Sequence, residues 1–241
     1  MAGIVIQVLQ ENTVTQASSL AIFDLDNTLL GGDSDHAWGE FLIERGLVDA
    51  TEHRQQNDAF YAAYCDGSLD IHAYLEFALR PLAGKTPTDI KPLQREFMQQ
   101  MIEPMRLPLA DTLLQMHRAR GDHLLIITAT NELITRPIAS WLGVADLLAC
   151  EAEIINGRYT GKPHGIPCFQ QGKVQRLQAW LADKPFMLEQ ATFYSDSHND
   201  LPLLEAVAEP VAVDADETLQ ALAKSRGWRM LSLREPKETL D

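Results

Sequence analysis

The sequence predicts an α/β protein with a doubly wound parallel sheet and an all-helical insertion after the first strand. Three short apolar runs, at 19–23, 123–128 and 191–195, each end at a polar residue, as buried strands do. Helical patterns separate the later runs, and strands that alternate with helices favour a parallel sheet covered on both faces. The long stretch after the first run contains no comparable strand.

Local signals place the remaining elements of the sheet layer. A fourth strand is expected at 209–213. Helices are expected over 109–120, 133–142 and 173–181. Gly121 and Gly143 are positioned to end the first two helices. Asn156 and Gly157 lie between β-type residues and predict a hairpin.

The inserted segment, 33–106, has a helical pattern throughout. Its apolar residues recur at three- and four-residue spacing: Trp38, Phe41, Leu42, Phe60, Tyr61, Tyr64, Tyr74, Leu75, Phe77 and Ala78. This spacing predicts about four helices, and packing between them is the simplest role for these residues. We therefore divide the chain into an N-terminal extension (1–18), a core (19–32 and 107–241) and a helical cap (33–106).

Composition and charge exclude several classes of function. The 241 residues are 46% hydrophobic and 22% charged, which is typical of a globular protein. The net charge of −14 argues against nucleic acids and anionic membranes as partners. No apolar run approaches the roughly 20 residues that span a bilayer, and no signal peptide is recognisable. We expect a cytoplasmic protein. The three cysteines, Cys65, Cys150 and Cys168, show no paired spacing, which suits a reducing compartment. We expect them to be buried thiols.

Six polar residues follow the predicted strands or open a helix. They are Asp24, Asp26, Thr128, Lys173, Asp196 and Asp200. A pair such as Asp24 and Asp26 is by itself more often a turn or a cap. In an open α/β sheet, however, ligands bind outside the carboxyl ends of the strands, where these residues converge. A cluster of carboxylates is repulsive at such an edge unless a divalent cation is bound.

Phosphoryl transfer through a carboxylate needs this combination of residues. An aspartate can attack phosphorus and form an aspartyl-phosphate, which divides one difficult displacement into two easier ones. Mg²⁺ suits two carboxylates and several waters and offsets the repulsion between phosphate and nucleophile. A lysine and a hydroxyl group hold the phosphate oxygens, and a second acid protonates the leaving group.

The four motifs "FDLDNTLL", "IITAT", "GKVQRL" and "YSDSHNDLPLL" resemble those of the haloacid dehalogenase (HAD) superfamily, in the same order. The resemblance spans roughly 19–213 and implies a Rossmann-like core. The helical insertion resembles the cap of the phosphoserine-phosphatase-like subgroup, subfamily IB. The resemblance implies that Asp24 is the nucleophile and Asp26 the general acid/base. Dehalogenases of the superfamily lack this second acid, so Asp26 favours a phosphatase, ahead of a phosphomutase.

The same resemblance assigns the other site residues. The metal would be Mg²⁺, bound by the carboxylates of Asp24 and Asp196 and the backbone carbonyl of Asp26, with Asp200 holding a metal-bound water or Lys173. Thr128 and Lys173 would bind phosphate. Asn27 and Thr28 would support the first loop at the phosphate, or simply cap the turn. Asn199 is expected to be structural and His198 a solvated neighbour.

The cap bears on the choice of substrate. Asp33 matches the position where phosphoserine phosphatases carry a glutamate that receives the substrate ammonium group, although a helix N-cap is an alternative role. Those enzymes also have a cap segment that resembles Ser-Leu-Arg-x-Arg, and the later arginine of this segment binds the substrate carboxylate. Here the nearest stretch is "FALRPL", in which Leu82 follows Arg80 and Pro81. Leucine cannot replace that arginine, so an amino alcohol phosphate without a carboxylate is favoured.

The stretch "FDLDNTLLGGDSDHAW" also resembles bacterial subgroup members that act on histidinol phosphate. This small phosphorylated metabolite has an ammonium group and an imidazole, which cap aromatics such as Trp38 could face. The alternatives are a phosphoserine phosphatase, a broad-specificity phosphatase and, more distantly, a non-catalytic phosphate-binding scaffold. The sequence is compatible with either a monomer or a homodimer.

Overall fold

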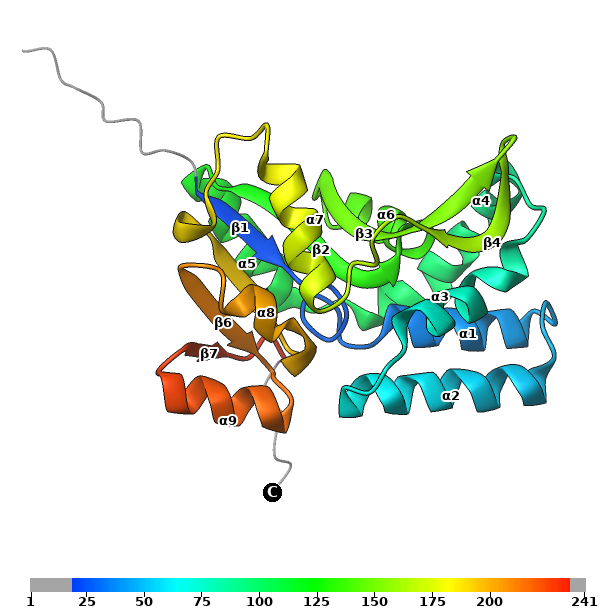
Figure 1. Ribbon diagram of the computed structural model, residues 1–241, viewed down its shortest axis with the longest axis horizontal. Coiled ribbons are helices and arrows are strands. Elements are labelled where there is room, and N and C mark those ends of the chain that lie inside the picture. The colour runs from blue at the N-terminus through cyan, green and yellow to red at the C-terminus, as the bar shows by residue number, and fades with distance from the viewer. Residues whose placement is uncertain (1–18, 235–241) are drawn as a thin grey trace, which may run out of the picture.

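A seven-stranded sheet runs through the molecule (Figure 1). The computed structural model describes residues 19–234. The strand order is β4-β3-β2-β1-β5-β6-β7, and neighbouring strands are parallel except β3 and β4. The strands are β1 (Leu20–Phe23), β2 (His123–Asn131), β3 (Asp146–Ile155), β4 (Arg158–His164), β5 (Thr192–Ser195), β6 (Glu209–Val213) and β7 (Arg229–Leu231). The predicted fold class is confirmed.

Helices cover the sheet and form a group beside it. They are α1 (Ser34–Glu44), α2 (Ala50–Asp66), α3 (Ile71–Leu79), α4 (Pro87–Phe97), α5 (Pro108–Arg120), α6 (Glu132–Trp141), α7 (Gln171–Leu181), α8 (Leu201–Leu204) and α9 (Glu217–Arg226). In Figure 1, α7 lies in front of the sheet and α5 behind it, whereas α1–α4 lie to one side. The sheet is therefore covered on both faces, as a doubly wound fold requires.

Strand β1 brings Asp24 to the edge of the sheet. All four residues of β1 are buried, and Phe23 is in register with Ile126 of β2 and Tyr194 of β5. The next residue, Asp24, still donates its backbone N–H to the Tyr194 carbonyl at 2.9 Å. Strand order reverses at β1, so Asp24 emerges at the switch point where open α/β sheets bind ligands.

Most predicted elements are present, with shifted ends. The helices predicted from 109, 133 and 173 begin one or two residues earlier, and β2 continues to Asn131. The Asn156-Gly157 hairpin is confirmed, and both residues have positive φ, 52° and 76°. This turn makes β4 antiparallel, so the sheet is not wholly parallel. Strand β7 was not predicted, because its three residues, Arg229–Leu231, carry no apolar run.

The helices α1–α4 are connected to the sheet by two segments that run side by side. Leu30 and Arg106 form an isolated antiparallel bridge, and Gly31 donates its N–H to the Met105 carbonyl at 2.8 Å. This pairing supports cap limits near 33 and 106. The three-part division of the chain stays a prediction, and its extension 1–18 lies outside the described residues.

The cap touches the rest of the molecule on two sides. The β3–β4 hairpin packs against it, where the backbone N–H of Gly84 donates to Tyr159 and that of Tyr159 donates to Lys85, at 2.8 and 2.9 Å. At the other side, Asn199 Nδ2 donates to the carbonyl of Tyr64 on α2 at 2.9 Å. These contacts place α1–α3 over the carboxyl ends of β1 and β2.

Helices α1 and α2 approach each other closely at Gly39. A Cβ atom there would lie 2.5 Å from Nδ2 of Asn57, which is closer than real contacts allow. The same Nδ2 donates to the carbonyl of His36 at 3.0 Å. The spacing of the two helices thus depends on the missing side chain of residue 39.

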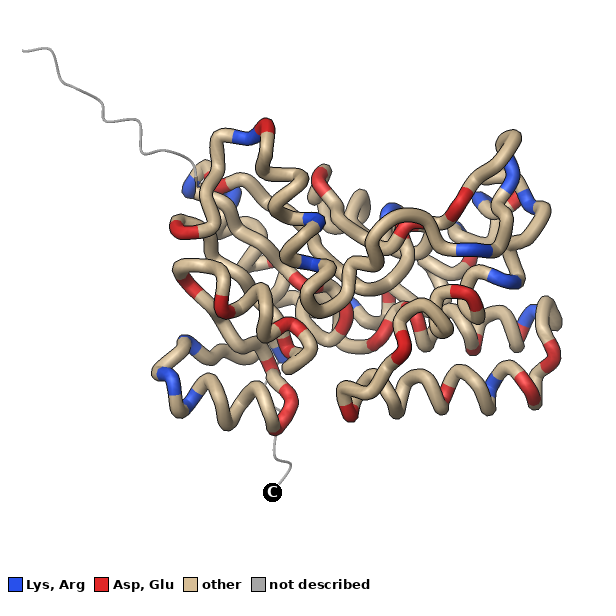
Figure 2. The backbone as a smooth tube through the Cα atoms, in the orientation of Figure 1, with Lys and Arg blue, Asp and Glu red and all other residues tan. Residues whose placement is uncertain are grey.

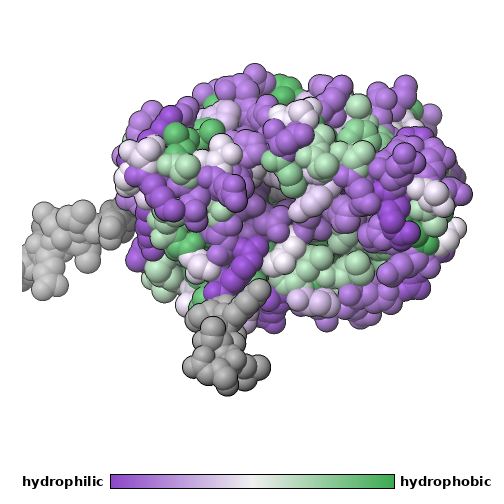
Figure 3. Space-filling view, turned by 90° about the horizontal axis from the view of Figure 1, so that it is seen from below, coloured by the Kyte–Doolittle hydropathy of each residue, from purple (hydrophilic) through white to green (hydrophobic). Residues whose placement is uncertain are grey.

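The surface agrees with the acidic composition. Lys and Arg are scattered over the described chain and do not gather on one face (Figure 2). The face in Figure 3 shows hydrophobic residues in separate groups among hydrophilic ones. Within residues 19–234, no helix has the length and apolarity needed to cross a membrane.

The cysteine prediction is partly wrong. Cys150 and Cys168 are buried, but Cys65 is exposed. It lies near the end of α2, a helix that buries only His53 and Asn57 completely and leaves much of its surface open to solvent.

Candidate active site

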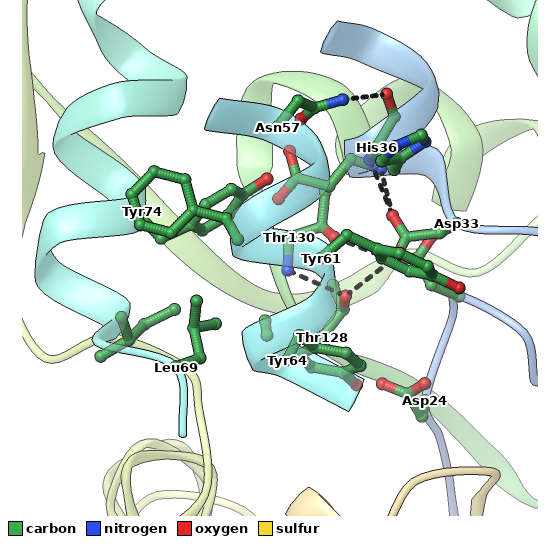
Figure 4. A pocket seen from close by; sticks show the side chains of 15 residues that line it. Asp24, Asp33, His36, Asn57, Tyr61, Tyr64, Leu69, Tyr74, Thr128 and Thr130 are labelled. Atoms are coloured by element: carbon green, nitrogen blue, oxygen red, sulfur yellow. Dashed lines mark hydrogen bonds between the residues drawn. The ribbon is translucent and has the colours of Figure 1, made fainter. Parts of the chain in front are cut away.

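A pocket lies between the strand ends and the cap helices (Figure 4). It contains about 530 Å³ of empty space, part of it open to solvent. The strand ends contribute Asp24, Asp26, Thr128, Ala129 and Thr130. The cap contributes Asp33, Asp35, His36, Asn57, Phe60, Tyr61, Tyr64, Leu69, Ile71 and Tyr74. The pocket is therefore acidic at its base and aromatic along its cap wall.

Lys173 binds two aspartates beneath the pocket. Its Nζ lies 2.8 Å from Asp24 Oδ1 and 2.7 Å from Asp200 Oδ1, and only 2% of its side chain is exposed. Ser195 Oγ donates to Asp200 Oδ2 at 2.7 Å. Burial opposes the charged form of Lys173, but Asp200 and Asp24 raise its pKa above the usual value. The lysine therefore stays protonated and neutralises charge at the base of the site.

Asp24 and Asp196 flank the hydroxyl group of Thr28. Thr28 Oγ1 lies 3.1 Å from Asp196 Oδ1 and 3.4 Å from Asp24 Oδ2. Burial raises the pKa of Asp24 to about 7, against the opposing effect of Lys173. Burial and the neighbouring Asp24 and Asp200 also raise the pKa of Asp196 well above its usual value. A buried and a partly buried carboxylate, both with raised pKa values, form an environment that a cation would relieve.

These oxygens fit a hard divalent cation, although the side chains do not surround a common point. Within residues 19–234, no three His, Cys, Asp or Glu side chains form a group that could hold a metal ion. Lys173 and Ser195 engage both oxygens of Asp200, and the Asp26 side chain is engaged elsewhere, whereas Lys173 binds Asp24 through Oδ1. Asp24 and Asp196 are thus the carboxylates suited to an ion, and the oxygen-only donor set suits Mg²⁺. The metal set stays a prediction.

Asp26 is held in a fixed orientation at the pocket. Its Oδ1 accepts the backbone N–H of Ser34 at 2.7 Å, and its Oδ2 accepts the Thr130 hydroxyl at 2.8 Å. Burial and the Asp33 charge raise the pKa of Asp26 to about 6, although the bonds from Ser34 and Thr130 act to lower it. A carboxyl group with such a pKa can both donate and accept a proton near neutral pH.

Asp33 fills the N-cap role that was one of the two predicted alternatives, and it also lines the pocket. It is the N-cap of α1, where its Oδ1 accepts the backbone N–H groups of Asp35 and His36 at 2.9 and 2.8 Å. It also lines the pocket, and burial raises its pKa despite these hydrogen bonds. Its contact with a substrate stays a prediction.

Trp38 does not face the pocket, contrary to our expectation. Its ring lies 5.0 Å from that of Phe97 and 5.5 Å from that of Phe41, and it is 2% exposed. The pocket lies at the N-terminal end of α1, and Trp38 is one turn further along, inside the cap. The aromatic residues that do line the pocket are Phe60, Tyr61, Tyr64 and Tyr74.

The residues around the first and fourth motifs have mainly structural contacts. Asn27 has a positive φ of 56° and turns the first loop, and it is not among the pocket-lining residues. Its role at the phosphate stays a prediction. Asn199 binds Tyr64 and accepts a hydrogen bond from Gln170, as a structural residue does. His198 is not freely solvated, because its Nδ1 lies 2.9 Å from Asp216.

Sequence reasoning missed Thr130 and Asp35. Thr130 lies two residues after Thr128 on the same strand, and side chains at this spacing share one face. This two-residue spacing was the sequence signal that could have identified Thr130 as a site residue. Asp35 carried no such signal, because an acidic residue in the first turn of a helix is common.

Three comparisons place the chain among known proteins. The model of the haloacid dehalogenase-like hydrolase family matches residues 21–205. A histidinol-phosphatase of Neisseria meningitidis serogroup C is 46% identical over 220 residues, which cover 90% of this chain and 99% of that protein. A phosphoserine phosphatase of Mycobacterium tuberculosis is 30% identical over 220 residues, covering 90% of this chain and 71% of the relative.

A solved structure supports the same placement. A crystal structure of a Bordetella pertussis protein has 41% identity and a TM-score of 0.83, and the match covers 90% of this chain and 99% of the other. The chain is a phosphatase of the haloacid dehalogenase-like hydrolase family.

Proposed function

We propose that this phosphatase is a magnesium-dependent phosphomonoesterase that hydrolyses histidinol phosphate through an aspartyl-phosphate. The observation that carries the chemistry is the placement of Asp24 between a buried lysine, 2.8 Å away, and the pocket that Asp26 also lines. The nucleophile and a second acid thus face one space, as attack and leaving-group protonation require.

The reaction needs two displacements at phosphorus. A carboxylate oxygen of Asp24 attacks phosphorus, the bond to the ester oxygen breaks, and Asp26 donates its proton to the departing alkoxide. Water then attacks the aspartyl-phosphate, Asp26 takes back a proton, and Asp24 and inorganic phosphate are released. Thr128 and Lys173 hold phosphate oxygens during both steps.

Asp24 and Asp196, with the backbone carbonyl of Asp26, would hold Mg²⁺. When bound, this ion supplies charge neutralisation between the phosphate and the carboxylates. The raised pKa values of Asp24 and Asp196 support the assignment, because a cation at their oxygens favours the ionised forms.

The pocket favours an amino alcohol phosphate as the substrate. No Arg is among its fifteen described lining residues, so a substrate carboxylate would lack a charged partner there. Asp33 suits an ammonium group, and the aromatic wall suits a planar ring. The identity of 46% with the Neisseria histidinol-phosphatase supports the same substrate. Phosphoserine is the second candidate, since one relative is a phosphoserine phosphatase.

Phosphate release tests the proposal. The purified chain should release phosphate from histidinol phosphate faster than from phosphoserine, as kcat/KM, and EDTA should abolish both reactions. Asp24→Asn should lower kcat at least about 10³-fold, because the nucleophile is lost. Full activity in Asp24→Asn, or in EDTA, would contradict the mechanism, and no turnover at all would favour a phosphate-binding scaffold. A preference for phosphoserine would overturn the substrate.

A further inference from the structure

Asp35 is a buried acid that the catalytic steps do not use. It lies in the first turn of α1 and lines the pocket, yet it is only 8% exposed. Its Oδ1 is a buried oxygen without a hydrogen-bond partner among the described residues. Asp26 and Asp33, by contrast, accept hydrogen bonds from backbone groups at 2.7–2.9 Å.

The start of α1 does not explain this residue. Asp33 already caps the helix, and an acid that serves only the helix dipole works equally well on the exposed face. A buried polar oxygen without a partner is rare in folded proteins and costs stability. A site that receives a donor from a ligand accounts for both the burial and the missing partner.

The surroundings of Asp35 indicate the chemistry of that donor. The hydroxyl groups of Tyr74 and Thr130 lie close enough to oppose a rise in its pKa, but burial and Asp33 raise the pKa well above the usual value. No Lys or Arg lines the pocket beside it, and His36, which does line it, pairs with Asp58 at 3.0 Å. The aromatic wall around it is formed by residues of α2 and α3, which suits a flat ring.

We infer that Asp35 Oδ1 accepts the ring N–H of a nitrogen heterocycle carried by the substrate, while Asp33 faces the substrate's ammonium group. This inference rests on the proposed function, because it names how the same pocket selects one phosphate ester. Asp35 is thus a specificity-determining residue: it distinguishes an imidazole-bearing amino alcohol from a plain aliphatic one. It has no part in bond breaking at phosphorus.

The test compares two alcohols that the enzyme cannot hydrolyse, L-histidinol and ethanolamine, by calorimetric titration of the full chain with Mg²⁺. Asp35→Asn should raise the Kd of L-histidinol about 10-fold or more, because the ring N–H then meets a neutral amide oxygen in place of a carboxyl oxygen. The Kd of ethanolamine should change less than about 2-fold, because it has no ring. Asp49→Asn, the same change at the exposed N-cap of α2, is the matched control and should change neither Kd.

Stability separates recognition from a structural role. Asp35→Asn should have a Tm equal to or above that of the wild type, because no existing hydrogen bond to Oδ1 is lost. Asp35→Ala provides a second variant that removes the acceptor entirely. The inference would be overturned if Asp35→Asn weakened the binding of both ligands equally or left the Kd of L-histidinol unchanged. It would also be overturned if the wild type did not bind L-histidinol more tightly than ethanolamine. These binding results stand apart from turnover, so a chain that releases no phosphate contradicts the proposed function and leaves this comparison decisive.

Discussion

The two walls of the pocket differ in how their charges are satisfied. At the strand ends, Asp24 is paired with Lys173, and Asp26 accepts two hydrogen bonds. On the cap wall, Asp35 has a buried oxygen without a partner. The difference agrees with phosphate-handling groups that the fold preorganises and with a recognition oxygen at Asp35 that the substrate would complete. Changes at Asp24 and Lys173 should therefore affect every ester, and changes in the cap only some.

After the loss of the nucleophile Asp24, the largest effect at the strand ends is expected for Asp26→Asn. The variant cannot protonate the leaving alkoxide, so kcat for histidinol phosphate should fall about 10²–10⁴-fold. p-Nitrophenyl phosphate should lose much less, because its leaving group departs without a proton. Steady-state kinetics on both esters measures the difference. Equal losses on both would mean that Asp26 acts only through the shape of the site.

Lys173→Met should slow both esters alike. The phosphate oxygens lose a charged partner, which we expect to lower kcat about 10²–10³-fold. Asp24 and Asp200 would also remain buried without their counterion, which should lower the free energy of unfolding by about 3–5 kcal/mol. Lys173→Arg keeps the charge and serves as the control in kinetics and urea denaturation. A loss confined to histidinol phosphate would place Lys173 in substrate selection instead.

A smaller and selective effect is expected at Asp33. Asp33→Asn keeps an N-cap side chain but removes the charge, so kcat/KM for histidinol phosphate should fall about 10-fold. p-Nitrophenyl phosphate, which has no ammonium group, should be unaffected. Thermal denaturation checks that α1 is intact. If both esters lose activity to the same extent, the residue serves only the helix.

A further prediction concerns stability and pH. The pKa values of Asp24 and Asp26 are raised from 3.8 to about 7 and about 6, so between those values the folded state binds more protons than the unfolded state. The metal-free protein should therefore lose stability from these groups as pH rises from about 4 to about 7.

Urea denaturation in EDTA at several pH values measures this slope. The double variant Asp24→Asn/Asp26→Asn should show a weaker dependence of the free energy of unfolding on pH, because neither carboxyl group can then titrate. Mg²⁺ should reduce the loss in the wild type, since a cation favours the ionised carboxylates. An unchanged slope in the double variant would assign the dependence to other groups.

The difference between the strand ends and the cap also explains which site residues could be predicted from the sequence. Asp24, Thr128 and Asp196 follow buried apolar runs, and parallel strands bring such positions to one edge whatever the rest of the chain does. The cap offers no such rule, because the contacts of a helix depend on its rotation and packing. Trp38 and Asp35 lie three residues apart on α1, yet one packs in the cap interior and the other lines the pocket. Only the packed helices distinguish them.

The close approach at Gly39 has a consequence for the pocket wall. Asn57, which fills the space beside Gly39, shares α2 with Phe60, Tyr61 and Tyr64 of the pocket wall. A methyl group at residue 39 would have to displace the Asn57 side chain, which lines the pocket, from its hydrogen bond to the His36 carbonyl. Substitution at residue 39, outside the pocket, would thus alter the cap wall through Asn57 and leave Asp24 unchanged.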